Sequence, residues 1–588
     1  MAILGVYEGH NAGAALISAD GTVLAAVEEE RFSRVKNHDA RPPDAPGPVR
    51  SVAWCLAAAT EEVTAIAVGL EEPEALHRRA VNTFLDLVAA GERQRLDRRH
   101  QLGLDAHDLL QMPLLTQRAR VAKALRTVAE AGLDPAGIPT MFVPHHTCHA
   151  AAFLLAPVDA ALVVTLDGKG DDLSGSVHDG QGHRLGPVAE VPTEASLGHL
   201  YSAATVACGL RPQRDEGKLT AMAASGTADP RLLKRLSAVM RFDPAAGVPR
   251  GSLGAGIVQG PYPDRIPGFH NERMAGLIAG LDRCDVAATV QQILEQVVVE
   301  FVEHHLRRSG SSALVVSGGV FANVTLNRRL AGLPGVQELH VHPGMTDSGI
   351  ALGAAAVVHA RTTGARPRPL NRIDLGPSFA DDAAAAAFRE QGYEVVAAAE
   401  GPERALAAAL ADGHVVARFA GGCEYGPRAL GHRSVLAPAG DPSVAAALND
   451  RLRRSHVMPF APVVPAAEAH RLFDGLEPVA GPTRFMTTSV RCRPEALAAL
   501  PAAVHLDGTA RPQLVHPGEN PRLALLLEEY RRRTGRPGLV NTSFNLHDEP
   551  IVCTPTDAAR SARAAGIAVV QVGDLVCAYG AESRSRSR

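Results

Sequence analysis

The segment PHHTCHA carries the sharpest chemical signal of the N-terminal half, in the histidines His145, His146 and His149. If this segment is helical, His145 and His149 lie one turn apart, so both imidazoles face the same way and can hold one divalent metal ion. A surface or capping cluster is the alternative for any two histidines at this spacing. The third histidine and the strand-like residues 141–143 before it support the metal site. Imidazole and carboxylate ligands without a thiolate suit Fe(II), Mn(II) or Zn(II).

Asp347, in GMTDSGIALGAA, is the natural third ligand. Its carboxylate follows the strand-like residues 338–342 and precedes a helix of small residues that can pack close to a ligand. The alternative is a helix N-cap, because Asp is favoured directly before a helix. Taken alone, Asp347 fits that alternative better, so its assignment as a ligand depends on the histidines.

Polar loops also supply candidate groups for catalysis and nucleotide binding. His10 and Asp167 occupy corresponding loops of two similar stretches of sequence. A carboxylate in such a loop can orient a metal or a water, or act as general base on an incoming hydroxyl, although an ordinary turn residue is the alternative. Gly318 and Gly319 follow a strand-like segment and open a helix, where a nucleotide can approach the backbone without meeting a Cβ atom.

The C-terminal third contains arginines in constrained surroundings. EYGPRALGHRS places Arg428, His432 and Arg433 in a loop fixed by Gly and Pro, which presents a guanidinium as a rigid fork to a phosphate or carboxylate. Solvated surface arginines are the alternative. The constrained surroundings argue against it for Arg428, whereas spacing does not decide for Arg453 and Arg511.

The elements that must position these groups form a repeated pattern. We expect strands at residues 3–7, 14–18 and 22–27, and again at 162–166, 175–178 and 185–191, with a Gly- and Asp-rich loop at 167–174. Two copies with a polar loop at the same place indicate an internal duplication. The fold that duplicates this unit is the actin-like or sugar-kinase-like ATPase, which grips nucleotide phosphates between its halves.

Helical periodicity accounts for much of the rest. We expect helices at 114–131, at 285–309 with Asp285 as its N-cap, and at 402–410, and strands at 314–317 and 415–419. Alternating helices and strands after residue 379 predict a second α/β domain. The Pro-containing stretch 365–378 between the domains is expected to be a linker, and the Ser/Arg tail 581–588 to be disordered.

Bulk composition limits the function classes. A chain of 588 residues fits two large domains or three average ones. The net charge of −4 leaves no basic surplus for a nucleic-acid backbone, so nucleic acid is not an expected partner. The 8 cysteines are scattered without a CxxC pair, as in a reduced cytoplasm. Without a basic leader or an apolar run of ~20 residues, a soluble cytoplasmic protein without a membrane partner is expected.

Many long motifs in the right order resemble the O-carbamoyltransferases of the nodulation, cephalosporin and tobramycin type, over nearly the full length. GHNAGAAL, AAVEEERFSRVKN, HHTCHAAAF, SLGHLYSAAT, SGGVFANVTLN and TDSGIALGAA resemble the first domain of that family, and LGPSF, EYGPRALGHRS, MPFAP and VNTSFN resemble the second. The resemblance implies an α/β protein. Its residues 1–364 would form a duplicated actin-like (ASKHA, RNase H-like) ATPase domain, and 379–580 a YrdC-like domain.

The resemblance also implies a two-step reaction. The second domain would convert carbamoyl phosphate and ATP, with Mg²⁺, into carbamoyl adenylate. The first domain would transfer the carbamoyl group to a hydroxyl of a small molecule, for which a secondary metabolite or antibiotic is the expectation. A homodimer is the expected assembly. A tRNA threonylcarbamoyl transferase and a non-catalytic actin-like ATP-binding regulator are the alternative functions, which the fused second domain, the lack of basic surplus and the retained arginines disfavour.

Site residues follow from the resemblance position by position. His145, His149 and Asp347 match the metal ligands, with Fe(II) as the expected ion. His10 matches a transfer-site histidine, and Asp167 a loop carboxylate expected to act as base. The residues expected to bind ATP, carbamoyl phosphate or the adenylate are Gly318, Gly319, Asn323, Lys218, Arg428, Arg453, Met486, Arg511, Asn541 and Ser543.

The chain departs from the family pattern at two places. Asn11 stands where the family usually has Asp, and Met458 stands where it has a phosphate-binding Arg. Methionine carries no charge, so this side of the anion pocket must be completed by another group, for which Arg454 and His456 are the candidates.

Overall fold

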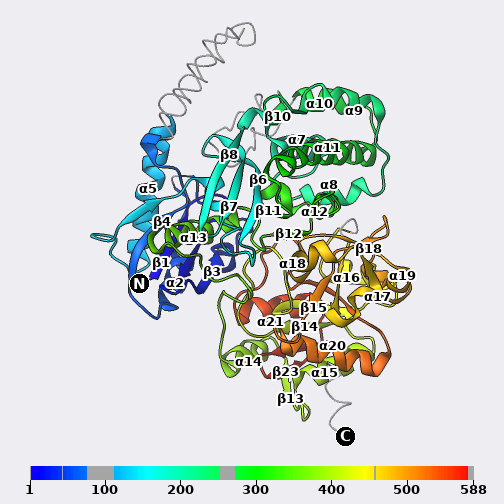
Figure 1. Cartoon of the computed structure of the whole chain (residues 1–588). Helices are drawn as coiled ribbons and strands as arrows, with labels where there is room; N and C mark the ends of the chain where they lie inside the picture. The colour runs from blue at the N-terminus through cyan, green and yellow to red at the C-terminus, as the bar shows by residue number, and fades with distance from the viewer. Residues whose placement is uncertain (1, 43, 76–111, 252–271, 456–458, 581–588) are drawn as a thin grey trace.

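The computed structural model describes residues 2–42, 44–75, 112–251, 272–455 and 459–580. The N-terminal region forms two halves, drawn in blue and in cyan to green in Figure 1, and a C-terminal domain lies beside them in yellow to red. The predicted disordered tail and Met458 lie outside the described residues.

The first half is built on a 5-stranded sheet of order β3-β2-β1-β4-β5. Its strands are β1 (Ala2–Tyr7), β2 (Gly13–Ile17), β3 (Val23–Glu28), β4 (Val63–Val68) and β5 (Thr140–Phe142), and its helices are α1 (Glu30–Ser33), α2 (Val49–Ala57) and α5 (Met112–Glu130). β1, β2 and β3 pair antiparallel as a meander, and β4 and β5 extend the sheet in parallel.

The second half repeats this topology. Its sheet has the order β12-β11-β6-β7-β8, formed by β6 (Ala160–Gly170), β7 (Leu173–Gln181), β8 (Arg184–Pro192), β11 (Ala313–Ser317) and β12 (Glu338–Val341). β6, β7 and β8 are again an antiparallel meander, and β11 and β12 again add in parallel. The predicted duplication of the actin-like type is therefore confirmed.

Most helices of the second half lie together on one side of its sheet, to the right of β6 and β11 in Figure 1. The described helices of this half are α6 (His145–Ala150), α7 (Leu197–Ala207), α8 (Glu216–Ala223), α9 (Pro230–Ser237), α10 (Glu272–Ile278), α11 (Arg283–Ser309) and α12 (Val324–Ala331), with the short 3-10 turns Gly319–Ala322 and Asp347–Gly349 and the hairpin β9 (Met240–Asp243) and β10 (Val248–Gly251).

Helix α13 (Ile350–Thr363) is buried on nearly all sides and packs against β1, β2, β4 and α6. Its small residues permit very close packing. A Cβ atom added to Gly5 would lie 2.0 Å from the Ala351 carbonyl oxygen, and one added to Gly353 would lie 2.1 Å from that of Cys148 in α6. The run of small residues therefore fixes α6 against the sheet of the first half.

Two local predictions were wrong. The N-cap of α11 is Asp282 and not Asp285, since the Asp282 carboxylate accepts hydrogen bonds from the backbone N–H groups of Cys284 and Asp285. The stretch 167–174 is not an open loop. Strand β6 continues to Gly170 and β7 begins at Leu173, because the hairpin needs only a tight turn with positive φ at Asp171 and Asp172.

The C-terminal domain is a three-layer α/β structure. Its 8-stranded sheet has the order β13-β23-β22-β14-β15-β21-β16-β20. The strands are β13 (Glu394–Val396), β14 (Val416–Phe419), β15 (Arg433–Pro438), β16 (Ala461–Pro465), β20 (Gln513–Val515), β21 (Leu539–Ser543), β22 (Val569–Val572) and β23 (Leu575–Ala578). A small sheet joins β17 (Phe473–Asp474), β18 (Val490–Cys492) and β19 (Thr509–Ala510).

Alternate strand residues face opposite helix layers, as a sheet covered on both faces requires. Val416 packs with α15 (Pro402–Ala411) and α20 (Pro521–Thr534), and Ala417 shares a core with α14 (Asp381–Glu390) and α21 (Pro555–Ala564). The remaining helices are α16 (Ser443–Arg451), α17 (Ala469–Leu472), α18 (Ala480–Arg484) and α19 (Pro494–Ala499). The predicted second α/β domain is present.

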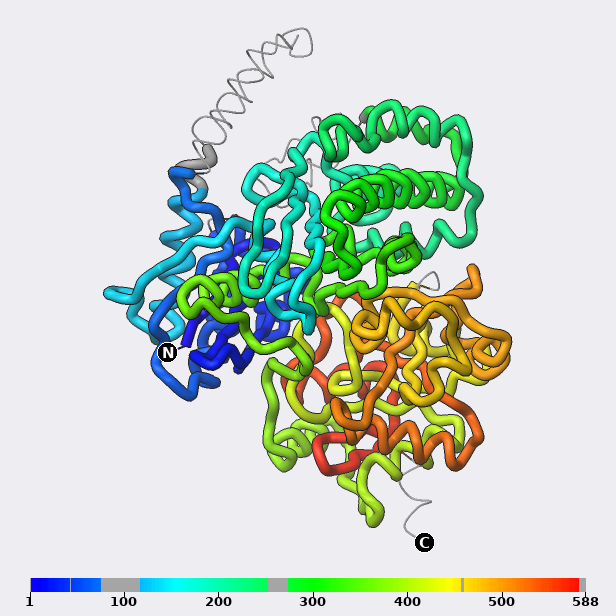
Figure 2. Tube along the Cα trace, viewed as in Figure 1, coloured from blue at the N-terminus to red at the C-terminus, as the bar shows by residue number. Residues whose placement is uncertain are grey.

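The connection between α13 and α14 contains no helix or strand, and its path from the first domain to the second can be followed in Figure 2. The Leu370 N–H donates to the Leu155 carbonyl of the first domain, at 2.8 Å. On the other side, the Tyr425 N–H of the second domain donates to the Ile373 carbonyl, at 2.7 Å. Leu370 and Ile373 are both buried, so the connection is bonded to each domain it joins.

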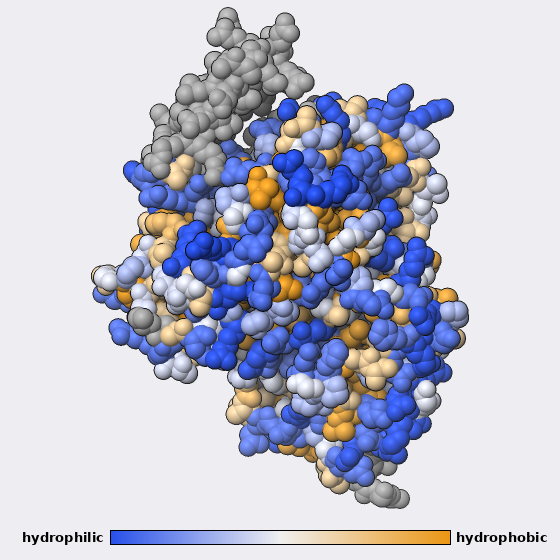
Figure 3. Space-filling view, in the orientation of Figure 1, coloured by the Kyte–Doolittle hydropathy of each residue, from blue (hydrophilic) through white to orange (hydrophobic). Residues whose placement is uncertain are grey.

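Three further features concern the surface, the cysteines and the helices. Apolar side chains form only small separate patches on the face shown in Figure 3. All 8 cysteines are free. Among the described helices, none combines the length and the apolar character that crossing a membrane requires.

Candidate functional site

Helix α6 presents the predicted histidine pair. The Asp171 carboxylate accepts a hydrogen bond from the His145 N–H at 2.7 Å and so fixes the first turn of the helix. His145 and His149 lie one turn apart and are 3% and 2% exposed, with ring centroids 4.8 Å apart. The burial excludes a solvated surface cluster for these two histidines.

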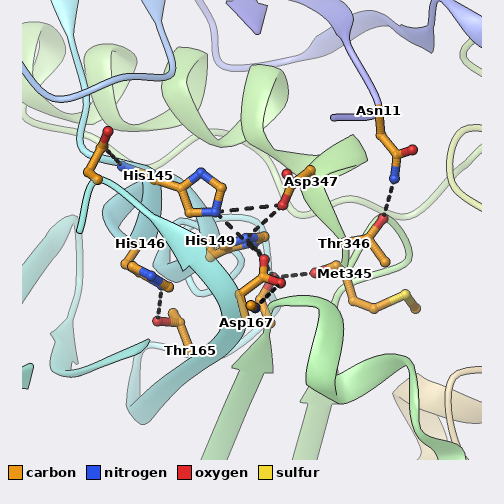
Figure 4. Close-up of polar contacts among 12 residues, drawn as sticks. Asn11, His145, His146, His149, Thr165, Asp167, Met345, Thr346 and Asp347 are labelled. Atoms are coloured by element: carbon orange, nitrogen blue, oxygen red, sulfur yellow. Dashed lines mark hydrogen bonds and ion pairs between the residues drawn. The ribbon is translucent and has the colours of Figure 1, made fainter. Parts of the chain in front are cut away.

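Two carboxylates from different elements converge on this pair (Figure 4). Asp167 comes from β6, and Asp347 begins the 3-10 turn before α13. The Asp167 Oδ2 atom lies 3.0 Å from the His149 Nε2 atom and 3.6 Å from the His145 Nε2 atom. The Asp347 Oδ1 atom lies 3.6 Å from each Nε2 atom.

The donor set fits a divalent metal ion. One ligand atom from each of His145, His149, Asp167 and Asp347 lies within 4.8 Å of the others. Among the described residues, the buried His145 Nε2 atom has no hydrogen-bond partner, as expected of an atom that binds a metal. Imidazole and carboxylate donors without a thiolate suit Fe(II), Mn(II) or Zn(II). Asp167, which we expected to be a base, thus also lies among the candidate metal ligands.

Neighbouring groups orient these four side chains. The Tyr7 hydroxyl donates to the Asp347 Oδ2 atom at 2.9 Å, and burial together with that carboxylate raises the pKa of Tyr7. The Ser317 hydroxyl lies 3.4 Å from the His149 Nδ1 atom. Burial disfavours the charged imidazole of His149, but hydrogen bonds to the two carboxylates outweigh it and raise its pKa to about 9.

The other first-domain candidates lie around this cluster. Burial and the Arg41 charge lower the pKa of His10, and the charges of Asp347 and Asp167 oppose this shift only in part. Asn11, beside it, donates to the Thr346 hydroxyl at 3.4 Å (Figure 4).

The double glycine has a packing role here. A Cβ atom on Gly318 would lie 2.2 Å from the Leu166 carbonyl oxygen, and one on Gly319 would lie 2.9 Å from the Asp167 Oδ1 atom. Asn323 caps α12 and donates to Gln291. Nucleotide binding by these three residues stays a prediction.

A second site is a cavity of about 230 Å³ between the two domains. Its lining includes the predicted residues Lys218, Arg428, Met486, Arg511, Asn541 and Ser543 and the candidate Arg454. It also includes Lys36, Arg214, Asn545 and His547, which the motif analysis did not assign to binding. Cationic side chains from both domains thus face one space.

Among the residues that the structure describes, Arg428 and Arg511 have no acidic partner. The Nε atom of each is buried and has no hydrogen-bond partner in that part of the chain. Burial lowers the pKa of Arg428 to about 10, and burial with the nearby Arg428 charge lowers that of Arg511. Both arginines are partly buried and their like charges lie near each other, an unfavourable arrangement that a bound anion would relieve.

Arg454 and not Arg453 lines the cavity. Arg453 has a positive φ of 56° directly after α16, and its side chain is exposed. Arg454 donates to the hydroxyl and the carbonyl of Ser543 and to Asn545. Arg454, one of the two candidates for completing the anion pocket, therefore lines the cavity, whereas the other candidate, His456, lies outside the described residues.

Two motif residues hold the loop together instead of facing the cavity. The Arg433 guanidinium donates to the Pro377 carbonyl at 3.0 Å and stacks 3.9 Å from the centre of the Phe419 ring. His432 contacts the Ala420 carbonyl at 3.0 Å. Neither residue lines the cavity.

Sequence reasoning missed Tyr7, Asp171, Lys36 and Arg214. Lys36 lies inside the quoted motif AAVEEERFSRVKN, so a signal was present, but nothing in the motif says that this lysine faces the second domain. Tyr7 gave no signal, because a tyrosine that ends a buried strand is ordinary.

Comparison with known proteins assigns a family. A model described as Carbamoyltransferase N-terminus matches residues 2–356, and one described as Carbamoyltransferase C-terminus matches residues 407–578. Nodulation protein NolNO of Sinorhizobium fredii is 32% identical over 93% of this chain and 76% of its own length. The uncharacterized protein sll1178 of Synechocystis is 31% identical over 95% of this chain and 93% of its own length.

Among solved structures, full-length HypF in its phosphate- and nucleotide-bound form aligns with 42% of this chain and 41% of its own, at 16% identity and a TM-score of 0.23. An alignment at that score adds no argument about function.

Proposed function

The chain belongs to the carbamoyltransferase family, and we propose that it activates carbamoyl phosphate with ATP and transfers the carbamoyl group to a hydroxyl of a small molecule. The observation that carries this proposal is the unpaired charge of Arg428 and Arg511 in the cavity between the domains. Fixed guanidiniums are suited to hold a phosphate and to stabilise the charge that develops as it leaves.

The first step belongs to this cavity. Water hydrolyses carbamoyl phosphate to carbamate and inorganic phosphate, and the carbamate oxygen then attacks the α-phosphate of ATP and displaces pyrophosphate. Lys36, Lys218 and Arg214 of the first domain add positive charge to the lining of the same cavity, which suits a polyphosphate. Enclosure between the domains protects the carbamoyl adenylate, an anhydride that water destroys.

The second step belongs to the cluster on α6. The hydroxyl oxygen of the acceptor attacks the carbamoyl carbon, and AMP leaves. A divalent ion held by His145, His149, Asp167 and Asp347 would supply Lewis-acid polarisation. His10, which burial keeps neutral, is the group proposed to take the proton of the acceptor, and Asp167 serves as a ligand.

Two variants separate the steps. Arg511→Ala is expected to abolish pyrophosphate release that depends on carbamoyl phosphate. His149→Ala is expected to abolish transfer and to retain pyrophosphate release. Normal pyrophosphate release by Arg511→Ala would remove the anion-pocket assignment, and full transfer by His149→Ala in metal-free buffer would remove the metal site.

The acceptor is found by screening. Mass spectrometry of hydroxylated secondary metabolites incubated with enzyme, ATP and carbamoyl phosphate should reveal one carbamoyl addition. Threonylcarbamoylation of tRNA from threonine and bicarbonate, with no product from any alcohol, would favour the alternative enzyme instead.

A further inference from the structure

The loop that carries Arg428 is held partly from outside its own domain. The Gly426 N–H donates to the Glu28 Oε1 atom at 2.8 Å, and the Arg31 Nη2 atom donates to the Gly426 carbonyl at 2.7 Å. Both polar groups of this one residue are therefore bound by side chains of the first domain. Glu28 ends β3 and Arg31 lies in α1, and they are only 4% and 1% exposed.

Glu28 and Arg31 also support each other. The Arg31 Nε atom lies 3.6 Å from the Glu28 Oε2 atom, and the Arg31 Nη1 atom pairs with Glu30. Burying these charges costs desolvation free energy, which good geometry and additional hydrogen bonds must offset. The Gly426 backbone supplies such hydrogen bonds, so the ion pair has a defined orientation relative to the loop.

The opposite side of Gly426 is confined as well. Gly426 has a φ of +92°, and a Cβ atom added there would lie 2.7 Å from the Pro343 carbonyl oxygen. A Cβ atom on Gly344 would lie 2.6 Å from the Tyr425 hydroxyl. The loop is thus seated between the ion pair and residues 343–344, which precede the metal-ligand candidate Asp347.

We propose that Glu28 and Arg31 are positioning residues of the anion pocket, which hold the Gly426 backbone so that Arg428 faces the bound carbamoyl phosphate. The inference rests on the proposed function, because it assumes that carbamoyl phosphate occupies the cavity. It assigns a task to the first domain in the first chemical step, separate from its own metal cluster.

Arg34 offers a matched control. Like Arg31 it reaches from the first domain to backbone carbonyls of the second, those of Ile551 at 2.8 Å and Pro550 at 2.9 Å, and it pairs with Asp557 at 3.3 Å. None of these partners belongs to the loop of Arg428. Loss of Arg34 therefore removes comparable contacts between the domains without releasing Gly426.

The test is calorimetric titration of carbamoyl phosphate into the full-length wild type, Arg31→Ala and Arg34→Ala. Arg31→Ala should raise the dissociation constant about tenfold or more, the equivalent of one lost charge-assisted contact, and Arg34→Ala should leave it within about twofold. Glu28→Ala should behave like Arg31→Ala. Glu28→Gln should recover part of the affinity, because its amide oxygen still accepts from the Gly426 N–H.

The outcomes are distinct. No carbamoyl phosphate binding by the wild type overturns the proposed function and this inference with it. Binding by the wild type with equal affinities for Arg31→Ala and Arg34→Ala overturns the positioning role alone, since general contact between the domains would explain both. If Arg31→Ala does not fold, Arg31→Lys compared with Arg34→Lys decides in the same way, because lysine keeps the charge but loses the fixed fork.

Discussion

The Tyr7 hydroxyl orients Asp347, one of the four candidate metal ligands. Its hydrogen bond to the Asp347 Oδ2 atom leaves the Oδ1 atom directed at the two histidines. Groups that orient a metal ligand in this way typically contribute about 10- to 100-fold to metal affinity. The hydroxyl is therefore a sensitive place to probe the site without removing a ligand.

We expect Tyr7→Phe to lower the affinity for Fe(II) or Zn(II) about 10- to 100-fold, since Asp347 loses its orienting donor. Competition with a chromophoric chelator measures this affinity. Tyr201→Phe is the matched control, because the Tyr201 hydroxyl is also buried and hydrogen-bonded, to Thr220 and Gln291. Equal metal affinities in both variants would speak against the assigned role.

Glu8 makes the stability of the protein depend on pH. Burial raises its pKa from 4.5 to about 7, against the opposing hydrogen bond from Thr127. The folded state therefore keeps a proton that the unfolded state releases. The contribution of Glu8 to stability falls as the pH rises between these values and stays low above them.

Glu8→Gln should remove this slope. We expect the variant to exceed the wild type by roughly 1–3 kcal/mol at pH 8 and to differ little at pH 4.5. Thermal unfolding at the two pH values measures the difference. A variant that is less stable than the wild type at pH 8 would contradict the assigned protonation.

Residue identities could be predicted where spacing alone fixes geometry. The one-turn separation of His145 and His149 was enough to foresee a shared face, because α6 is helical over that interval. The choice between Arg453 and Arg454 could not be foreseen. It depends on the left-handed backbone at Arg453, which no propensity of arginine indicates.

At the level of elements, the packing of α13 on α6 fixes where the histidines lie. Gly353 approaches the Cys148 carbonyl oxygen, one residue before His149. An alanine at this position cannot fit unless one of the helices moves. The geometry of the candidate metal site thus depends on Gly353, although this residue provides no ligand.

Gly353→Ala should destabilise the fold by about 1–3 kcal/mol through overpacking, and should also weaken metal binding. Gly276→Ala in α10 is the control, since a Cβ atom there meets no described residue within 4 Å. That variant should gain up to about 1 kcal/mol from helix propensity. Thermal unfolding with metal titration tests both, and a neutral Gly353→Ala would contradict the tight contact.

The repeated meanders could be predicted because each strand pairs with its neighbour in the sequence. The order of the 8-stranded sheet could not, since β13 pairs with β23 across most of the second domain. The N-cap of α11 was misplaced by 3 residues because Asp282 and Asp285 both suit that position, and only backbone geometry separates them.

For the whole molecule, the main feature is a cavity to which both domains contribute. Lys218 of α8 lines it and pairs with Asp215 at 2.8 Å. Nearby, Arg211 of the first domain binds Asp548 of the second at 2.7 Å. In the proposed reaction, the first step therefore depends on residues from the domain proposed to perform the second step.

Lys218→Ala should lower pyrophosphate release that depends on carbamoyl phosphate about tenfold, through loss of one charge-assisted contact. Lys234→Ala, on the exposed face of α9, is the control and should leave the rate unchanged. A Lys218→Ala rate equal to that of the control would show that Lys218 takes no part in this step.

The connection at 365–378 has a practical consequence for protein engineering. Interdomain segments are the usual junctions for chimeras that combine parts of related enzymes. Here the backbone of that segment is hydrogen-bonded to Leu155 on one side and to Tyr425 on the other, so a cut there would break both attachments. A chimera should therefore take this segment and both of the domains that it contacts from the same parent. Exchange of surface turns is the safer design.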